Sequence, residues 1–162
     1  MSGEVSTIEP EFSGQGRRVA IVVSRFNQMI GESLLEGARS TLIEKGVAAP
    51  DILVARVPGA YELPVAAKVI ARGGEYDAVI CLGAVVRGET PHFDYVAGEA
   101  ARGLTEVSLD TERPILFGVL TTDTMQQAVD RAGGRHGNKG EDTALGALEM
   151  VNLLDRLREK RA

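Results

Sequence analysis

The 162-residue sequence contains no tryptophan, a single cysteine and only two histidines. One cysteine cannot form an internal disulfide and matches no metal-ligand spacing, so neither a disulfide framework nor a cysteine metal centre is expected. Cys81 lies within an apolar run and is interpreted as a small core residue rather than a nucleophile. No apolar stretch is long enough to span a bilayer, and the N-terminus lacks the apolar region of a signal peptide. We therefore expect a cytoplasmic protein.

Basic residues are also fewer than acidic residues. The chain has 18 Lys and Arg against 23 Asp and Glu, which gives a formal net charge of −5. This balance argues against a nucleic acid or an anionic membrane surface held through bulk charge. It leaves room for an anionic small molecule held by a few local donors. The composition, 44% hydrophobic and 25% charged, is that of a soluble globular protein, and the length suits one domain.

Four apolar runs alternate with helical patterns along the chain. The runs predict buried strands at 18–23, 52–57, 78–86 and 114–121. Apolar residues at helical spacing predict helices over about 29–45, 62–72, 93–109, 124–132 and 141–160, with a Gly-rich break at 133–140. This order predicts an α/β fold, a three-layer α/β/α sandwich with a four-stranded parallel sheet.

The two ends of the chain carry further expectations. The polar residues 1–17 are expected to be ordered only on assembly, and residues 18–162 to form one domain. In the last helix, five apolar residues are expected to face inward. They are Leu145, Leu148, Val151, Leu154 and Leu157.

Polar and aromatic residues follow three of the predicted strands, at 24–27, 58–62 and 87–92. Because the carboxyl ends of parallel strands share one edge of a sheet, these loops should meet. Together they offer the Phe26 ring, the Glu62 carboxylate and the His92 imidazole. Backbone N–H groups at a helix start can bind an anion, and an imidazole can transfer protons near neutral pH. The set predicts chemistry on a phosphorylated small molecule beside a flat polar ring.

Six motifs give the chain a resemblance to the 6,7-dimethyl-8-ribityllumazine synthase family. They are SRFN at 24–27, PGAYELP at 58–64, GAVVRGETPHFDYV at 83–96, FGVLTT at 117–122, DRAG at 130–133 and GNKG at 137–140. The motifs are long and ordered, and the resemblance runs from about Val19 to the last helix. It implies a flavodoxin-like sheet and a transferase that uses no metal and no redox cofactor.

The reaction that the resemblance implies is the penultimate step of riboflavin biosynthesis. The family joins 5-amino-6-(D-ribitylamino)uracil to 3,4-dihydroxy-2-butanone 4-phosphate and releases phosphate and water. The uracil's 5-amino group condenses with the ketone to a Schiff base, phosphate leaves, and the ring closes with loss of water. The product is 6,7-dimethyl-8-ribityllumazine.

The resemblance also implies roles for individual residues, with His92 as the general acid and base. The residues implied to contact the ribitylaminouracil are Phe26, Ala60, Tyr61, Glu62, Ala84, Val85, Val86, Phe117 and Lys139. Those implied to contact the butanone phosphate are Gly88, Glu89, Thr90 and Arg131. In the family, Phe117, Arg131 and Lys139 enter from the neighbouring subunit. Without the resemblance, Phe26 is explained as a core cap and Arg131 as a solvated helix residue, and His136 is interpreted as a surface residue.

Family members form pentamers, and some pack twelve pentamers into a shell of sixty subunits. The uninterrupted turn at 133–140 resembles the shell-forming members. The N-terminal segment has Pro10 but no proline placed to turn it away from a neighbour's sheet. We therefore expect the sixty-subunit shell. Two alternatives stay open, a non-catalytic flavin- or lumazine-binding homologue and a cage that houses a partner such as riboflavin synthase.

Overall fold

The computed structural model of the chain describes residues 3–161. Residues 1–2 of the predicted N-terminal segment and residue 162 of the predicted domain lie outside the described residues. Its centre is a parallel sheet of four strands in the order β2-β1-β3-β4. The strands are β1 (Val19–Ser24), β2 (Ile52–Val57), β3 (Ala78–Val86) and β4 (Ile115–Thr122). This order is that of a flavodoxin-like sheet, and the predicted sandwich is confirmed.

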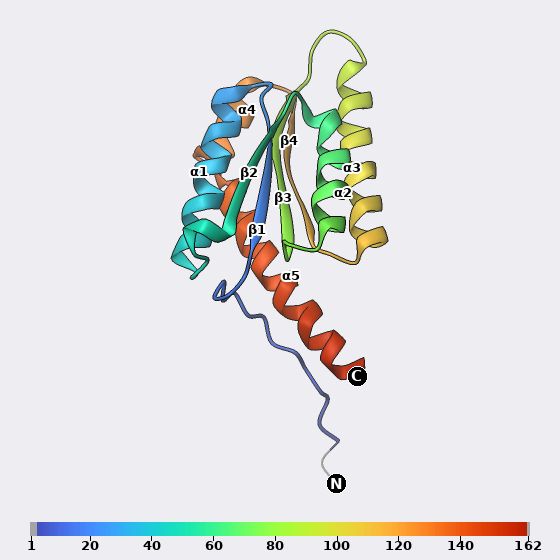
Figure 1. Ribbon diagram of the computed structural model, residues 1–162. Helices are drawn as coiled ribbons and strands as arrows, with labels where there is room; N and C mark the ends of the chain where they lie inside the picture. Colours follow the sequence, from blue (N-terminus) through green and yellow to red (C-terminus); the bar gives the residue numbers. More distant parts are fainter. Residues whose placement is uncertain (1–2, 162) are drawn as a thin grey trace.

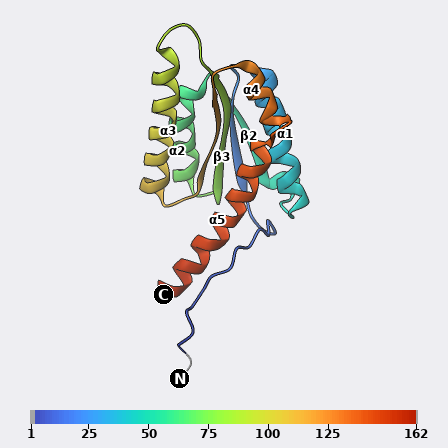
Figure 2. The ribbon, with the colours of Figure 1, turned by 180° about the vertical axis from the view of Figure 1, so that it is seen from behind.

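Helices cover both faces of the sheet. They are α1 (Gln28–Glu44), α2 (Leu63–Gly73), α3 (His92–Thr111), α4 (Met125–Asp130) and α5 (Lys139–Arg161), with short 3-10 turns η1 (Ala49–Asp51) and η2 (Ala60–Glu62). Figures 1 and 2 show α2 and α3 on one face, and α1, α4 and α5 on the other. Each strand and helix predicted from the sequence is present, with ends that differ by a few residues.

The alternation of side chains along the central strands divides the core into two clusters. Ile21 of β1 and Ile80 of β3 point toward α1 and α5. Val22 of β1 and Cys81 of β3 point toward α2 and α3. All four side chains are fully buried, as expected for strands covered on both faces. The prediction that Cys81 is a core residue is confirmed.

The segment 133–140, predicted as a break, contains a small antiparallel hairpin, β5 (Ala132–Gly134) with β6 (Gly137–Asn138). The last helix also begins earlier than predicted, at Lys139. The cause is the Asn138 side chain, whose Oδ1 accepts the backbone N–H of Gly140 at 2.7 Å and so caps the helix. The start of α4 is capped by Thr124, because Thr124 Oγ1 accepts the N–H of Gln127 at 3.1 Å.

The end of α5 leaves the body of the molecule. Leu148 and Val151 are buried as predicted, but Leu157 is 42% exposed, so its predicted inward position is wrong for the single chain. Figure 2 shows this half of α5 running past the sheet, with the N-terminal segment beside it. Asn152 holds that segment, because its Nδ2 donates to the carbonyl oxygens of Glu11 at 3.0 Å and Ser13 at 3.1 Å.

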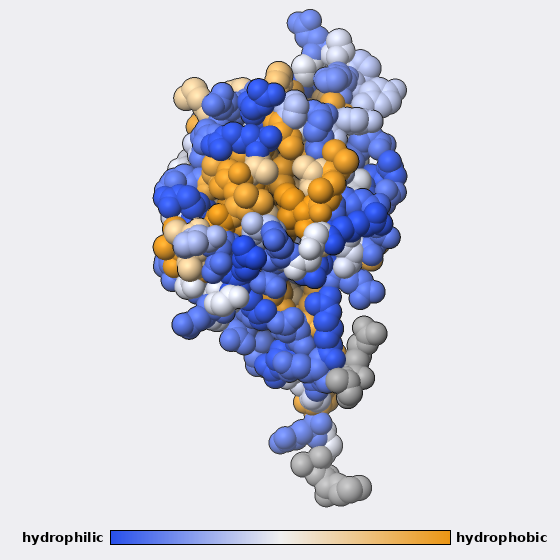
Figure 3. Space-filling model, in the orientation of Figure 1, coloured by the Kyte–Doolittle hydropathy of each residue, from blue (hydrophilic) through white to orange (hydrophobic). Residues whose placement is uncertain are grey.

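An apolar area lies on the face that carries the edge strand β2. Figure 3 shows apolar side chains gathered at the centre of this face, in the orientation of Figure 1. Leu53 of β2 is 36% exposed, and Val65 and Val69 of α2 are 65% and 69% exposed. An open strand edge beside exposed apolar side chains is a typical site of association. None of the helices in residues 3–161 is both long and apolar enough to cross a membrane.

Candidate active site

The three loops singled out in the sequence meet at the carboxyl edge of the sheet. They enclose a hollow of about 700 Å³, which we call the first hollow. Its walls are Phe26, Pro58, Gly59, Ala60, Tyr61, Glu62, Ala84, Val85, Val86, Gly88, Thr90, His92, Phe93, Tyr95 and Val96. The prediction that these loops meet is therefore confirmed. Glu89, which was predicted beside Gly88 and Thr90, is exposed and is not among the residues of the wall.

The loop after β1 presents Phe26 to the first hollow. Asn27 adopts a left-handed conformation with φ 59°, and its Nδ2 donates to the carbonyl oxygen of Ala84 on β3 at 2.9 Å. The Phe26 N–H donates to the carbonyl oxygen of Pro58 at 3.2 Å. The loop is thus attached to both neighbouring strand ends. The Phe26 side chain is 70% exposed, which excludes its explanation as a cap of the core.

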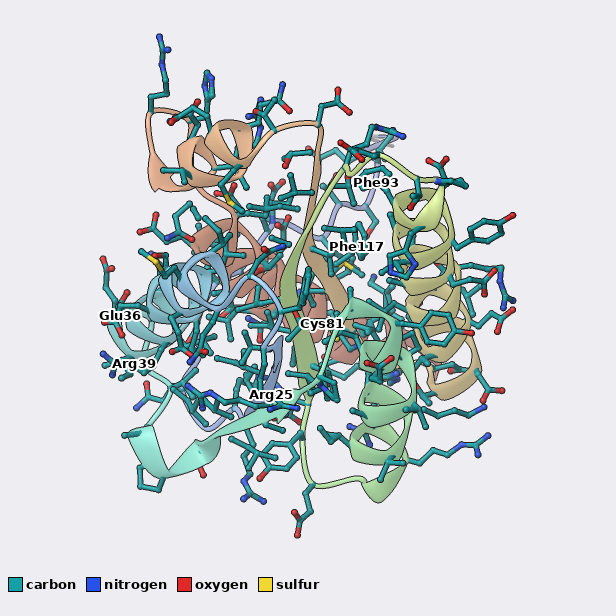
Figure 4. All side chains as sticks on the ribbon, turned by 90° about the horizontal axis from the view of Figure 1, so that it is seen from above. Arg25, Glu36, Arg39, Cys81, Phe93 and Phe117 are labelled. Carbon is teal, nitrogen blue, oxygen red and sulfur yellow. The ribbon has the colours of Figure 1, made fainter. Side chains whose placement is uncertain are left out.

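The loop after β3 brings His92 to the rim of the first hollow. His92 is the first residue of the 20-residue helix α3, and its backbone N–H donates to Thr90 Oγ1 at 3.4 Å. Figure 4 looks down on this edge of the sheet and shows Phe93 at the start of α3. The arrangement places an imidazole at the N-terminus of a long helix, where the helix dipole stabilises an anion.

The remaining predicted residues lie in a second hollow of about 540 Å³, around the end of β4, α4 and the start of α5. Its walls are Phe117, Val119, Leu120, Thr121, Thr122, Gln127, Arg131, His136, Lys139 and Asp142. Phe117, Arg131 and Lys139 are therefore together, but none of them lines the first hollow. Within one chain the structure does not unite all the predicted site residues.

Sequence reasoning missed several polar residues of the second hollow, among them Gln127 and Asp142. Gln127 supplies the carbonyl oxygen that accepts Arg131 Nη1 at 3.0 Å. Asp142 stands three residues after Lys139 on α5, on the same side of the helix. That spacing could have identified Asp142 if the helix had been predicted to begin at Lys139. His136 is exposed, as expected, but it also lines this hollow.

Cys81 is excluded as a nucleophile by the burial of its thiol. Complete burial raises the pKa of the Cys81 thiol to about 12, because the thiolate would lose its hydration. A thiol held in the protonated form is a poor nucleophile. The groups available for proton transfer and anion binding are thus the exposed side chains of the two hollows.

Comparison with known proteins agrees with this geometry. Residues 16–155 match the model of the family described as 6,7-dimethyl-8-ribityllumazine synthase. A protein of that name from Desulfatibacillum aliphaticivorans is 53% identical over 151 residues, which cover 93% of this chain and 97% of the relative. A second, from Desulfotalea psychrophila, is 53% identical over 150 residues, with the same coverage of both chains. The chain therefore belongs to the 6,7-dimethyl-8-ribityllumazine synthase family and is an enzyme of riboflavin biosynthesis.

Proposed function

We propose that this chain condenses 5-amino-6-(D-ribitylamino)uracil with 3,4-dihydroxy-2-butanone 4-phosphate at a site built between two neighbouring copies. The observation that carries the proposal is the division of the predicted residues. Apart from the exposed Glu89, the residues that the family resemblance assigns to one subunit line the first hollow, and the three assigned to its neighbour line the second. A site in which the first hollow of one copy faces the second hollow of the next would contain all of these wall residues.

The first hollow supplies the groups that bind the ribitylaminouracil. The exposed Phe26 ring offers a flat apolar surface on which the uracil stacks. The backbone groups of Ala84, Val85 and Val86 bond the polar edge of the uracil, and the backbone at Ala60–Glu62 with the Glu62 carboxylate holds the ribityl hydroxyls. Phe117 and Lys139 of the neighbouring copy complete this part of the site.

The butanone phosphate binds next to the ring. The N–H groups at Gly88, Glu89 and Thr90 and the start of α3 favour a phosphate there. Arg131 of the neighbouring copy completes the phosphate site, because a guanidinium pairs with two phosphate oxygens at once. His92 stands beside this loop, within the same hollow.

His92 moves the protons of the reaction. The 5-amino group of the uracil attacks the ketone carbonyl, and water leaves as the C=N bond of the Schiff base forms. Loss of the proton from the hydroxyl-bearing carbon next to the imine then forms a C=C bond as the C–O bond to phosphate breaks and phosphate leaves. The resulting enol becomes a ketone, which the ribitylamino nitrogen attacks to close the ring with release of a second water. These steps move protons at nitrogen, oxygen and one carbon, and His92 is the group we assign to that transfer.

We propose that the copies close into a pentamer, and that twelve pentamers form a shell. The exposed apolar side chains of β2 and α2 and the open edge of β2 support an interface on that face. The division at residue 18, the capture of riboflavin synthase inside a shell and a cytoplasmic location stay predictions. Light scattering that finds a particle of only five or ten subunits would exclude the shell.

Mixing two variants of impaired activity tests the composite site directly. His92→Ala removes a residue of the first hollow, and Arg131→Ala removes one of the second. When the two proteins are unfolded and reassembled together at equal amounts, about a quarter of composite sites contain both native side chains. We expect activity well above that of either variant alone, measured as the fluorescent lumazine formed above the uncatalysed rate. A mixture no more active than its components would show that both residues act within one chain.

A further inference from the structure

The loop that carries the proposed phosphate contacts has little packing of its own. Residues 88–91 are all exposed, and a side chain added at Gly88 would meet no heavy atom within 4 Å among the described residues. The hydrogen bonds of the loop are local, from the His92 N–H to Thr90 Oγ1 and from the Asp94 N–H to the Pro91 carbonyl oxygen at 3.0 Å. Such a loop needs another group to fix its shape.

Arg87, the residue before this loop, makes the contacts that the loop lacks. Its Nη1 donates to Asp94 Oδ1 at 3.4 Å, which joins the two ends of the loop, and its Nε donates to Asp123 Oδ1 at 2.9 Å. The guanidinium also lies over the ring of Phe93, 4.3 Å from the ring centroid. Phe93 is a wall residue of the first hollow, so Arg87 connects the loop to that hollow and to the β4–α4 turn.

Arg87 also offsets negative charge beside the loop. The carboxylates of Asp94 and Asp123 are 64% and 69% exposed and flank the loop. The hydrogen bond that Arg87 donates to Asp123, together with the charges of both carboxylates, raises the pKa of Arg87 above its usual value. Without this cation, the two carboxylates would face an incoming phosphate unpaired and repel it.

We propose that Arg87 is a positioning residue of the phosphate loop, which joins the ends of the loop and offsets part of the negative charge of Asp94 and Asp123. It acts through the loop and these carboxylates and does not itself contact the phosphate, because Arg87 is not a wall residue of the first hollow. This inference rests on the proposed role of residues 88–90 in binding the butanone phosphate.

The test is a comparison of KM values for the two substrates. Arg87→Gln removes the cation, and we expect the KM for the butanone phosphate to rise roughly tenfold while the KM for the ribitylaminouracil stays within about twofold. Arg39→Gln is the matched control, because Arg39 is 45% exposed against 46% for Arg87 and is also bonded to a carboxylate, that of Glu36. Figure 4 shows Arg39 and Glu36 on the outer side of α1, away from Phe93. Equal changes in both KM values, or none, would overturn the inference.

Two further variants separate the effects of charge and of shape. Arg87→Lys keeps the charge but cannot reach Asp94 and Asp123 with one planar group, so it should lie between the native protein and Arg87→Gln. Adding Asp123→Asn to Arg87→Gln removes a carboxylate that has lost its cation and should lower the KM for the butanone phosphate again. If the double variant has the same KM for the butanone phosphate as Arg87→Gln, the proposed effect of Arg87 on the charge of these carboxylates is wrong.

Arg131→Ala distinguishes a failure of this inference from a failure of the proposed function. If Arg131→Ala raises the KM for the butanone phosphate and Arg87→Gln does not, the role of Arg87 is wrong and the phosphate site stands. If neither variant raises it, the phosphate site itself is assigned wrongly. Light scattering and far-UV circular dichroism on each variant establish that the fold and the assembly are intact.

Discussion

The backbone N–H of Lys139 donates to the carbonyl oxygen of Arg131 at 2.9 Å, so the two cations of the second hollow stand at the two ends of one short hairpin. The hairpin is itself attached to α1, because Asn138 Nδ2 donates to the carbonyl oxygen of Ser33 at 3.1 Å. The spacing of the two basic residues is therefore set by backbone hydrogen bonds before any substrate arrives. A site fixed in this way loses less conformational entropy when an anion binds.

Arg131→Ala should weaken the binding of the butanone phosphate more than that of the ribitylaminouracil. Hydrogen bonds to a charged group contribute about 1.5–3 kcal/mol, so the affinity for the phosphorylated substrate should fall roughly ten- to a hundredfold. Arg135→Ala is the control, because Arg135 is an exposed arginine of the same hairpin region and is not a wall residue of the second hollow. Titration calorimetry with each substrate measures the difference. Equal losses for both substrates would contradict the phosphate role of Arg131.

His92→Gln should lower kcat by roughly a hundred- to ten-thousandfold, the usual effect of removing a general acid or base. The exposed position of His92 at the start of α3 means that the substitution leaves the packed core untouched. Both KM values should therefore change little. Steady-state rates with each substrate varied in turn test this. A kcat equal to that of the native protein would assign proton transfer to another group.

The sheet was predictable from the sequence because the strands at 52–57 and 78–86 are apolar runs bounded by turn residues, and the structure has them at the same bounds. The hairpin at 132–138 was not, because its two short strands carry glycine and polar residues and depend on contacts with α1. The inward position of Leu157 failed for a related reason. Helical periodicity identifies an apolar face, but it does not say whether that face packs within the chain or extends beyond it.

The candidate site was likewise predictable only in part. The residues of the first hollow follow strands, so the rule for parallel sheets was enough to bring Phe26, Glu62 and His92 together. Gln127 and Asp142 lie within helices that the sequence predicted, but the structure was needed to show that they face the second hollow. A polar side chain on a predicted helix has no pattern in one sequence that distinguishes a site residue from a solvated one.

Phe26→Ala should raise the KM for the ribitylaminouracil by roughly three- to tenfold, because an aromatic contact contributes about 0.5–1.5 kcal/mol beyond its buried area. The thermal midpoint should not change, since 70% of the Phe26 side chain is exposed in the chain. Phe26→Trp keeps a stacking surface and should keep the native KM. Met29→Ala is the control, because Met29 is 86% exposed on the next turn and does not line the first hollow. A normal KM for Phe26→Ala would remove the ring from the uracil site.

The Cys81 thiol should be unreactive in the folded protein. Burial raises its pKa to about 12, whereas the unfolded value is near 9.0, so the folded state holds its proton over a pH range in which the unfolded chain loses it. Because the folded state keeps this proton, the free energy of unfolding falls as pH rises from about 9 to 12. Iodoacetamide at pH 8 should label Cys81 only after denaturant is added. Rapid labelling of the native protein would show that this strand opens or that the site is accessible.

Gly140→Ala should destabilise the fold strongly, because α5 crosses α1 at this residue with almost no space between the two backbones. A Cβ at Gly140 would overlap the carbonyl oxygen of Leu34, which cannot move aside as a flexible side chain can. Gly98→Ala is the matched control, since Gly98 also lies within a helix but meets no heavy atom within 4 Å among the described residues. Alanine has the higher helix propensity by about 1 kcal/mol, so the control should raise the thermal midpoint while Gly140→Ala lowers it by several degrees or prevents folding. Thermal melts followed by circular dichroism give both values. A midpoint for Gly140→Ala equal to that of the native protein would mean that α1 and α5 separate at little energetic cost.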